Sequence, residues 1–234
     1  MTTLNYIDIK RKVKIPNKDS DQLAEFFGIL TGDGYIGKYR NNHVIEIAGN
    51  KLKDKDYLEN HVSKLMYSLF NLKPNIYFRK EQNTMYAKIQ SKFILEYLIS
   101  KGFKMGVKGR INIPDWIKEE DKLMLYFIKG LFDTDGCIWF KRKEGKLYPG
   151  ITIGSKSDLL LLDIRPFLIN RGISSYFATI KYPKGRYKSS FNVYQLQING
   201  YKNVTNWFQK IGSNNKRNID RFNEMIKLRN LKKL

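Results

Sequence analysis

The sequence has few of the residues on which several common protein classes depend. Cys137 is the only cysteine, which excludes a disulfide framework and a cysteine-rich zinc site. His43 and His61 are the only histidines, and we expect both on the surface or in a sheet. The chain lacks an apolar segment long enough to span a membrane, and its N-terminus lacks a signal-peptide pattern. These absences predict a soluble, intracellular protein, in an archaeal cytoplasm or an organelle.

Acidic residues are scarce relative to basic ones. Asp and Glu number 22 against 43 Lys and Arg, which gives a net charge of +21. At this chain length the imbalance indicates a polyanionic partner, most simply a nucleic acid. A membrane-surface protein or a ribosomal protein is the alternative. Hydrophobic residues make up 42% of the chain, which is enough for packed cores, so a disordered basic tail is excluded.

A short glycine-rich stretch occurs twice and organises the rest of the chain. The copies are FFGILTGDGYIG at 26–37 and IKGLFDTDGCIW at 128–139. Each is a hydrophobic run that ends in Asp-Gly and is followed by an alternating run typical of a strand. Asp33 and Asp135 are separated by 135 − 33 = 102 residues in a chain of 234. A repeat at nearly half the chain length predicts two similar halves.

Small residues in both copies predict a close helix pair. Gly28 and Gly32 are four residues apart and therefore share one face of a helix, as do Gly130 and Thr134. Glycine costs a helix about 1 kcal/mol relative to alanine, so two glycines in one helix indicate a close backbone approach. Two helices packed through these faces would bring their C-terminal ends together.

The aspartates that close the two motifs would then face each other. This is unfavourable, because helix C-termini are negative and like charges repel. A divalent cation would resolve both problems, and oxygen ligands with open coordination positions suit magnesium. We therefore expect Mg²⁺ at Asp33 and Asp135. The alternative for either motif alone is an Asp-Gly turn after a helix.

The paired motif resembles that of the LAGLIDADG homing endonucleases in their single-chain form with two repeats. The matching segments are 26–34 and 128–136, and Thr31 departs from the family's inner acidic position. The matching residues are Gly28, Asp33, Gly34, Gly130, Asp133, Asp135 and Gly136. One copy alone would be weak evidence, whereas two copies with matched surroundings are strong evidence.

The resemblance implies an α+β fold of two pseudo-symmetric αββαββα repeats, whose antiparallel sheets form a DNA-binding saddle. We expect one repeat at 1–115 and the other at 116–234. Expected elements of the first repeat lie at about 20–32, 35–40, 43–50, 56–70, 76–80, 85–90 and 91–101. Those of the second lie at about 120–134, 137–143, 147–155, 157–170, 175–182, 191–198, 201–211 and 218–228. A basic N-terminal tail would contact DNA phosphates or remain solvated, and its charged residues are Lys10, Arg11, Lys12 and Lys14.

The resemblance also implies metal-assisted phosphodiester hydrolysis. In the family, the two motif acids hold cations that activate water and stabilise the leaving oxygen. Asp33 and Asp135 are therefore the expected catalytic residues and metal ligands, and Gly32 and Thr134 are the expected additional ligands. One acid serves each strand, so the family cuts both strands across the minor groove.

Two lysines are expected near the scissile phosphate as catalytic helpers. Lys108 lies just before the start of the second repeat. Lys216 lies 216 − 108 = 108 residues after Lys108. The alternative for either lysine is a solvated surface position. The position that often carries Gln in the family falls near Gly49-Asn50 and Ser155-Lys156, where neither half has that residue.

Alternation in the hairpins predicts DNA-binding faces, because side chains of successive strand residues point to opposite sides. A two-stranded ribbon fits the major groove, where Arg, Lys and Gln read base edges. The alternative for any one strand is an ordinary solvated sheet face. The expected contacts are Tyr77, Arg79, Tyr86, Lys88 and Gln90 in one half and Thr179, Lys181, Gln195 and Gln197 in the other.

The sequence thus predicts an intron-encoded homing endonuclease that cuts double-stranded DNA at a long asymmetric site. Since both motifs are in one chain, we expect a monomer that needs no membrane and no protein partner. An RNA maturase and a DNA-binding regulator on the same fold are the alternatives. Regulators of that kind tend to lose the acids and gain a helix-turn-helix, and neither change is evident here.

Overall fold

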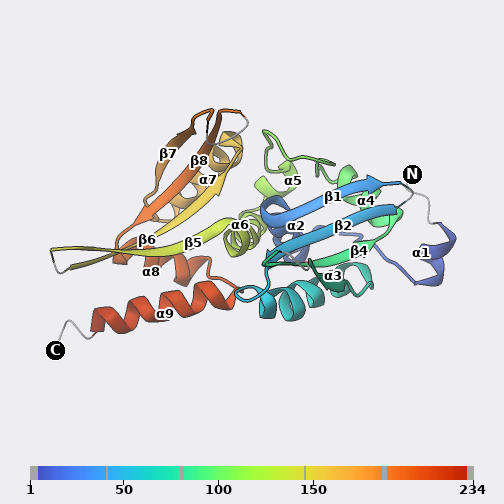
Figure 1. Cartoon of the computed structure of the whole chain (residues 1–234), viewed down its shortest axis with the longest axis horizontal. Coiled ribbons are helices and arrows are strands. Elements are labelled where there is room, and N and C mark those ends of the chain that lie inside the picture. Colours follow the sequence, from blue (N-terminus) through green and yellow to red (C-terminus); the bar gives the residue numbers. More distant parts are fainter. Residues whose placement is uncertain (1–4, 41, 80–81, 145, 186–188, 231–234) are drawn as a thin grey trace. The chain divides into compact units, whose positions relative to one another are not determined.

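The computed structural model describes residues 5–40, 42–79, 82–144, 146–185 and 189–230, and Figure 1 gives the order of its elements. The chain divides into two compact units. The first comprises Met1–Lys108, Pro114–Thr134 and Asn214–Lys216, and the second comprises Gly109–Ile113, Asp135–Ser213 and Arg217–Leu234. None of the described helices combines the length and the apolar character of a membrane span.

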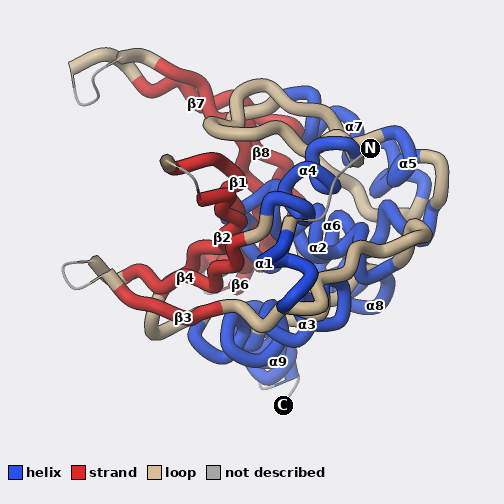
Figure 2. The backbone as a smooth tube through the Cα atoms, turned by 90° about the vertical axis from the view of Figure 1, so that its right-hand side faces the viewer, coloured by secondary structure: helices blue, strands red, loops and turns tan. Residues whose placement is uncertain are grey.

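The first unit contains a four-stranded antiparallel sheet in the order β1-β2-β4-β3. Its strands are β1 (Gly34–Tyr39), β2 (Asn42–Asn50), β3 (Asn75–Phe78) and β4 (Thr84–Gln90). Its helices are α1 (Tyr6–Lys10), α2 (Asp21–Asp33), η1 (Tyr57–Val62), α3 (Ser63–Phe70), α4 (Lys92–Ser100), α5 (Asp115–Lys118) and α6 (Asp121–Asp135), whose last residue belongs to the second unit. Figure 2 shows α2, α3 and α4 along one side of these strands.

The second unit repeats this arrangement with the sheet order β5-β6-β8-β7. Its strands are β5 (Gly136–Lys143), β6 (Lys146–Ser155), β7 (Tyr176–Tyr182) and β8 (Phe191–Asn199). Its helices are α7 (Asp158–Asn170), α8 (Tyr201–Lys210) and α9 (Lys216–Asn230), whose first residue belongs to the first unit. Both halves therefore follow the order αββαββα, and the predicted α+β class is confirmed.

Apolar residues of alternating strand positions and of one helix face form the core of each unit. In the first unit Ile36, Ile45 and Ile47 of the sheet and Phe26 of α2 are fully buried. Burying a side chain of this size stabilises the fold by about 1.5–3 kcal/mol. The opposite face of the same strands is left for polar and aromatic residues, which makes it available for binding.

Serine side chains begin three of the helices. Ser20, Ser91 and Ser157 each occupy the N-cap position and accept a hydrogen bond from the backbone N–H three residues later. Such a cap satisfies an N–H that has no partner inside the helix and is worth about 1 kcal/mol. Local sequence thus determines where these helices begin.

The N-terminal segment is packed against the first unit through its backbone and two buried residues, Asp8 and Val13, while its charged residues are exposed, namely Lys10, Arg11, Lys12 and Lys14. Asp8 of α1 is 1% exposed, and its carboxylate accepts a hydrogen bond from the Phe93 N–H at 3.3 Å. Farther along, the Lys14 N–H donates to the Phe70 carbonyl oxygen at 3.1 Å. A helix as short as α1 is too short to show a helical period, so the sequence pattern gave no signal.

The compact units do not coincide with the two halves of the sequence. Helix α6 begins the second repeat, yet it belongs to the first unit as far as Thr134. The segment Asn214–Lys216 also returns to the first unit. The boundary between residues 115 and 116 remains a prediction about the two sequence repeats. The compact units divide the chain at other positions.

Candidate functional site

Helices α2 and α6 meet backbone to backbone at two glycines. A Cβ at Gly28 would lie 2.0 Å from the Phe127 carbonyl oxygen, and a Cβ at Gly130 would lie 2.2 Å from the Glu25 carbonyl oxygen. Both distances are far below van der Waals contact, so neither position can hold a side chain. The two contacts are symmetric, because both 130 − 28 and 127 − 25 equal the 102-residue offset of the repeat. We call this contact the glycine seam.

The two other small residues expected in the seam make different contacts. The Gly32 carbonyl oxygen accepts a hydrogen bond from the Lys108 ammonium. The Thr134 hydroxyl donates to the carbonyl oxygens of Gly130 at 3.2 Å and Leu131 at 3.0 Å within its own helix. Back-bonding of this kind is a common way to satisfy a hydroxyl in a helix.

Lys108 lies at the C-terminal end of α2. Its ammonium donates to the carbonyl oxygens of Leu30 at 2.9 Å and Thr31 at 2.8 Å, and also to that of Gly32. The last carbonyls of a helix have no partner inside the helix, and the negative end of the helix dipole favours a cation. Lys108 is therefore a helix-end cation held next to Asp33, and not a solvated surface lysine.

The two motif aspartates each end a helix and precede a strand directly. Asp33 is the last residue of α2 and Asp135 is the last residue of α6, and β1 and β5 begin at the next residue. A Cβ at Gly34 would lie 2.6 Å from the Leu30 carbonyl oxygen, which explains the glycine at this junction. Asp33 is half-buried in the first unit, and Asp135 is exposed in the second.

Several carboxylates act on the buried Tyr57 phenol in the first unit. Tyr57 is only 3% exposed, and its pKa is raised well above its ordinary value by burial first, then by the charges of Asp133, Glu25 and Asp33. The phenol therefore stays neutral.

The oxygen donors available here fit a hard divalent cation. Among the described residues there is no ready-made group of three or more His, Cys, Asp or Glu side chains for a metal ion. Mg²⁺ is usually held by one or two carboxylates together with water and phosphate oxygens. Asp33 and Asp135 are carboxylates of this kind, each at the end of a motif helix.

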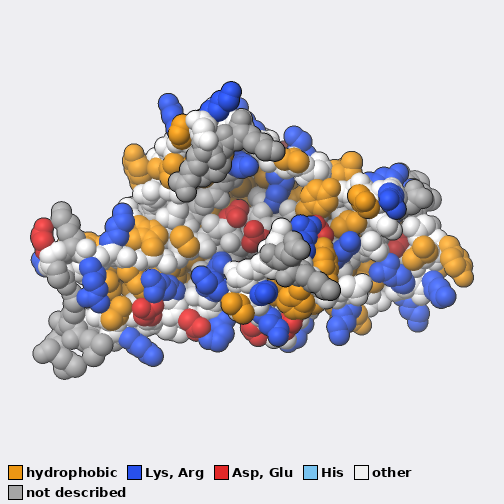
Figure 3. Space-filling model, in the orientation of Figure 1, with side chains coloured by type: hydrophobic (Ala, Val, Ile, Leu, Met, Phe, Trp, Pro, Cys, Tyr) orange, Lys and Arg blue, Asp and Glu red, His pale blue; other side chains and the backbone are white. Residues whose placement is uncertain are grey.

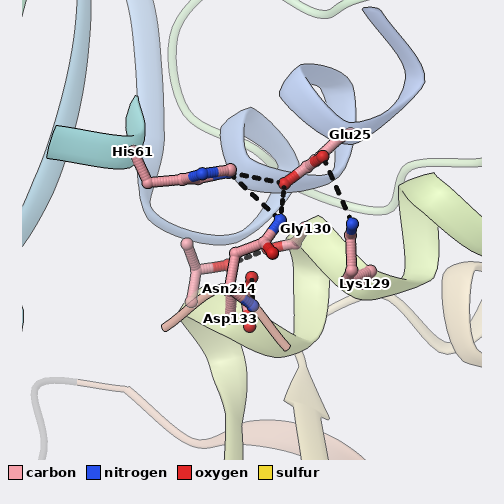
Figure 4. Close-up of polar contacts among 7 residues, drawn as sticks. Glu25, His61, Lys129, Gly130, Asp133 and Asn214 are labelled. Carbon is pink, nitrogen blue, oxygen red and sulfur yellow. Dashed lines mark hydrogen bonds and ion pairs between the residues drawn. The ribbon is translucent and has the colours of Figure 1, made fainter. Parts of the chain in front are cut away.

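Next to the glycine seam lies a buried polar network, drawn in Figure 4. Glu25 is 4% exposed, and its Oε1 atom lies 2.7 Å from both His61 Nε2 and Asn214 Nδ2. Lys129 Nζ lies 3.6 Å from its other oxygen. Burial raises the pKa of Glu25, but the His61 hydrogen bond and the Lys129 charge outweigh burial and hold this pKa below its ordinary value.

Asp133 connects this network to the residues that directly precede α9. Its Oδ2 atom accepts from the Asn214 N–H at 2.9 Å, and its carbonyl oxygen accepts from Asn215 Nδ2 at 3.0 Å. Asn215 Nδ2 also donates to Asp54 Oδ1 at 2.9 Å. The inner acidic residue of the second motif thus fixes the segment in which Lys216, the other predicted helper lysine, begins α9.

Sequence reasoning did not find this network. His61 lies in η1 with its side chain 30% exposed, which agrees with the expected surface position, but its contact with Glu25 is not foreseen. The only local signal was a glutamate inside the apolar run of α2. The partners Asn214 and Asn215 lie far away in the sequence and carry no motif.

One face of the first sheet gathers all five residues predicted there as DNA contacts. Tyr77 pairs with Tyr86 across β3 and β4, and the two rings stack 5.0 Å apart. The Arg79 guanidinium lies 4.9 Å from the Tyr86 ring, and Lys88 Nζ lies 5.8 Å from the Tyr77 ring. Tyr77, Arg79, Lys88 and Gln90 help to line an open hollow of about 270 Å³.

In the second sheet the four predicted contacts lie on two different faces. Gln195 and Gln197 share one face, and Gln197 Nε2 donates to Gln195 Oε1 at 3.1 Å. Gln195 pairs with Ala178, so Thr179 and Lys181, one and three positions later, point to the other side. The expectation of a single face for all four is wrong, because the pairing register of β7 cannot be read from alternation alone.

Comparison with known sequences gives a family match and partial relatives. Residues 122–212 match the family model for a LAGLIDADG-like domain. An uncharacterised protein of Methanocaldococcus jannaschii is 30% identical over 186 residues, which cover 78% of this chain and 66% of that protein. The glutamine–fructose-6-phosphate aminotransferase of the same organism is 23% identical over 216 residues, which cover 92% of this chain but 18% of that protein. The chain therefore spans only part of these relatives.

Comparison with solved structures identifies the fold. The I-LtrWI LAGLIDADG homing endonuclease bound to target DNA matches with a TM-score of 0.59 and 12% identity, over 91% of both chains. I-DmoI in complex with DNA and Mn matches with a TM-score of 0.56 and 20% identity, over 82% of this chain and 96% of that one. At these identities the likeness establishes a shared fold.

Proposed function

We propose that this chain, which carries a LAGLIDADG-like domain at residues 122–212 on the fold of the two-domain LAGLIDADG homing endonucleases, is a metal-dependent, site-specific DNA endonuclease. The observation that carries the proposal is the repeated helix end. Asp33 and Asp135 each close a helix of the glycine seam, directly before a strand. The I-DmoI and I-LtrWI structures contain DNA, and one of the I-DmoI structures also contains Mn.

The chain's own residues would bind and orient the scissile phosphates. Asp33 and Asp135 would hold a divalent cation, one acid for each DNA strand, with the carbonyl oxygens of Gly32 and Thr134 as the additional ligands. A bound Mg²⁺ supplies activated water and stabilises the leaving oxygen. Lys108, fixed by carbonyl oxygens at the end of α2, keeps a positive charge beside Asp33 for the phosphate. Lys216 would serve the second repeat.

Charge and sheet chemistry support double-stranded DNA as the substrate. The net charge of +21 favours a polyanion, and Figure 3 shows lysine and arginine side chains spread over the face in view. The aromatic and basic face of the first sheet would bind one half of the target in the major groove. In the second sheet we assign this role to Gln195 and Gln197, and not to Thr179 and Lys181.

The two repeats differ in sequence, which favours a long asymmetric target recognised by one chain. By the same resemblance we propose that the endonuclease is encoded within an intron. The presence of an aspartate at the end of both motifs favours an endonuclease over an RNA maturase or a DNA-binding regulator, neither of which requires both acids.

A cleavage selection tests the proposal. The chain is incubated with a randomised duplex library in Mg²⁺, and the cut ends are sequenced. We expect double-strand cleavage at a single long site that lacks two-fold symmetry, and EDTA should abolish it. Absence of any sequence-specific cleavage in Mg²⁺ or Mn²⁺ would overturn the assignment.

A further inference from the structure

Among the described residues, one glutamate stands in the basic and aromatic face of the first sheet. Glu46 lies on β2, where it pairs with Tyr35 on one side and Lys88 on the other. Its side chain helps to line the open hollow of about 270 Å³, and of the described residues that line this hollow it alone is acidic. A carboxylate in this place requires an explanation, because it opposes the attraction of the surrounding cations for phosphate.

The carboxylate is held in position by its neighbour on β3. The Tyr77 hydroxyl donates to Glu46 Oε2 at 2.9 Å, and the Tyr77 ring is fixed by its stack on Tyr86. Burial, followed by this hydrogen bond and the Glu46 charge, raises the pKa of Tyr77 to about 12. At neutral pH the phenol therefore keeps its proton and donates it to this hydrogen bond.

Glu46 keeps acceptor capacity on the side that faces the hollow. A carboxylate has about four lone-pair positions, and Tyr77 uses one of them. Among the described residues no lysine or arginine forms an ion pair with Glu46. Arg79 and Lys88 instead contact tyrosine rings, at 4.9 Å from the Tyr86 centroid and 5.8 Å from the Tyr77 centroid. An incoming hydrogen-bond donor would find a fixed, charged acceptor.

DNA offers such donors only on its bases, because its phosphates and sugar oxygens accept hydrogen bonds. In the major groove the donors are the exocyclic amino groups, N4 of cytosine and N6 of adenine. At the corresponding positions in the major groove, guanine and thymine present hydrogen-bond acceptors, O6 and O4. A carboxylate would therefore attract cytosine and adenine and repel guanine and thymine.

Resting on the proposed function, we infer that Glu46 is a specificity-determining residue, which accepts a hydrogen bond from the exocyclic amino group of one base in the target half bound by the first sheet. Tyr77 is the positioning residue that orients its carboxylate. The protein would prefer cytosine or adenine over guanine and thymine at that one position. The binding experiment with single-base-pair variants shows which of the two preferred bases it is.

The experiment measures binding in EDTA, so that no strand is cut. The wild-type target and all of its single-base-pair variants are bound to the full chain and to Glu46→Gln and Glu46→Ala. Wild type should favour cytosine or adenine at one position by roughly 10- to 100-fold. In Glu46→Ala this preference should fall to within about 3-fold, while binding to unrelated duplex DNA holds or strengthens, because a negative charge has been removed.

Matched variants separate recognition from charge and from packing. Glu59 of η1 is exposed, so Glu59→Gln makes the same charge change away from the sheet and should leave every base preference unchanged. Tyr77→Phe keeps the ring stack but removes the hydroxyl, so it should weaken the preference at the same base pair as Glu46→Ala. Glu46→Gln has nearly the same shape as the native residue, but its amide adds a donor that guanine O6 and thymine O4 can accept. The discrimination against guanine and thymine should therefore weaken, which keeps the test valid if the alanine variant unfolds.

Two outcomes contradict the inference. One is a Glu46→Ala variant that retains all base preferences of the wild type, or a Glu46→Gln variant that discriminates against guanine and thymine as strongly as the wild type does. The other is a uniform loss of affinity for every sequence, which would mean that Glu46 only supports Tyr77. Failure of the proposed function looks different, because the wild-type chain itself would then bind no duplex sequence selectively.

Discussion

Gly130 of α6 lies so close to Glu25 of α2 that a Cβ on the glycine would stand 2.2 Å from the Glu25 carbonyl oxygen. The side chain of the same glutamate contacts His61 and Asn214 in the buried polar network. One residue of α2 thus joins the glycine seam through its backbone and the polar network through its side chain. A change in the seam should therefore disturb the network as well.

Replacing either seam glycine by alanine should destabilise the protein. Gly28→Ala and Gly130→Ala each force a methyl group into a neighbouring backbone, and such overpacking costs about 1–3 kcal/mol. Urea unfolding followed by circular dichroism measures the free energy. Gly109→Ala is the control, because a Cβ there meets nothing within 4 Å, and its effect should stay within about 0.5 kcal/mol. Equal stability of all three variants would contradict the seam.

Replacing either motif aspartate by asparagine should abolish double-strand cleavage and leave DNA binding largely intact. Asp33→Asn and Asp135→Asn remove a charged cation ligand without changing shape. Supercoiled plasmid carrying the target distinguishes uncut, nicked and linear products. Asp115→Asn is the control, because that side chain is 84% exposed on α5. Linear product from either motif variant at the wild-type rate would refute the assignment.

Removing the helix-end ammonium should lower both stability and activity. Lys108→Met leaves the terminal carbonyls of α2 without their cation, which should cost about 1–2 kcal/mol in the free energy of unfolding. Because the Lys108 charge would also stabilise the scissile phosphate, the rate of single-turnover cleavage should fall even under conditions in which the variant is fully folded. Lys104→Met, at an exposed position nearby, should change neither quantity. A fully stable Lys108→Met variant would show that the carbonyl contacts contribute little.

Glu25 should make stability depend on pH in the acidic range. Its pKa is lowered in the folded state, so its contribution is fully present above its unfolded-state value of about 4.3. The contribution is lost as pH falls through the lower folded-state pKa. Unfolding free energies of wild type and Glu25→Gln, measured between about pH 3 and 7, should converge at the acid end. A difference that is constant over this range would contradict the lowered pKa.

The chain should act on DNA as a monomer. Both motif helices are in one polypeptide, so a second chain is not needed to complete the pair of acids. Light scattering of the purified complex should give the mass of one chain per duplex. A stable dimer on a palindromic duplex would contradict this expectation.

The features that the sequence predicted are those set by local pattern. The helix expected at about 20–32 follows from a hydrophobic run that ends in Asp-Gly, and the seam follows from small residues four apart. By contrast, the contact of Asp8 with Phe93 joins positions 85 residues apart, and that of Asn215 with Asp54 joins positions 161 apart. Such partners are selected by tertiary packing, which leaves no period in the sequence.

The faces of the hairpins illustrate the same limit in the candidate binding site. Alternation correctly grouped Tyr77 of β3 with Arg79, which directly follows β3 and still hydrogen-bonds to Thr84 of β4 through its backbone N–H. It failed for Thr179, because the phase between β7 and β8 depends on how the strands pair, and a shift of one residue reverses the face. Glu46 was missed because its importance arises from the neighbours that pairing brings to it.

The return of Asn214–Lys216 to the first unit also constrains the order of events during synthesis. A chain that leaves the ribosome from its N-terminus can form the first sheet early, but α2 lacks its seam partner until α6 has emerged. The hydrogen bonds from Asn214 to Glu25 and Asp133 can form only after Asn214 has been synthesised. The first unit therefore reaches its final packing only after most of the second has been translated, so the two halves mature together and not one after the other.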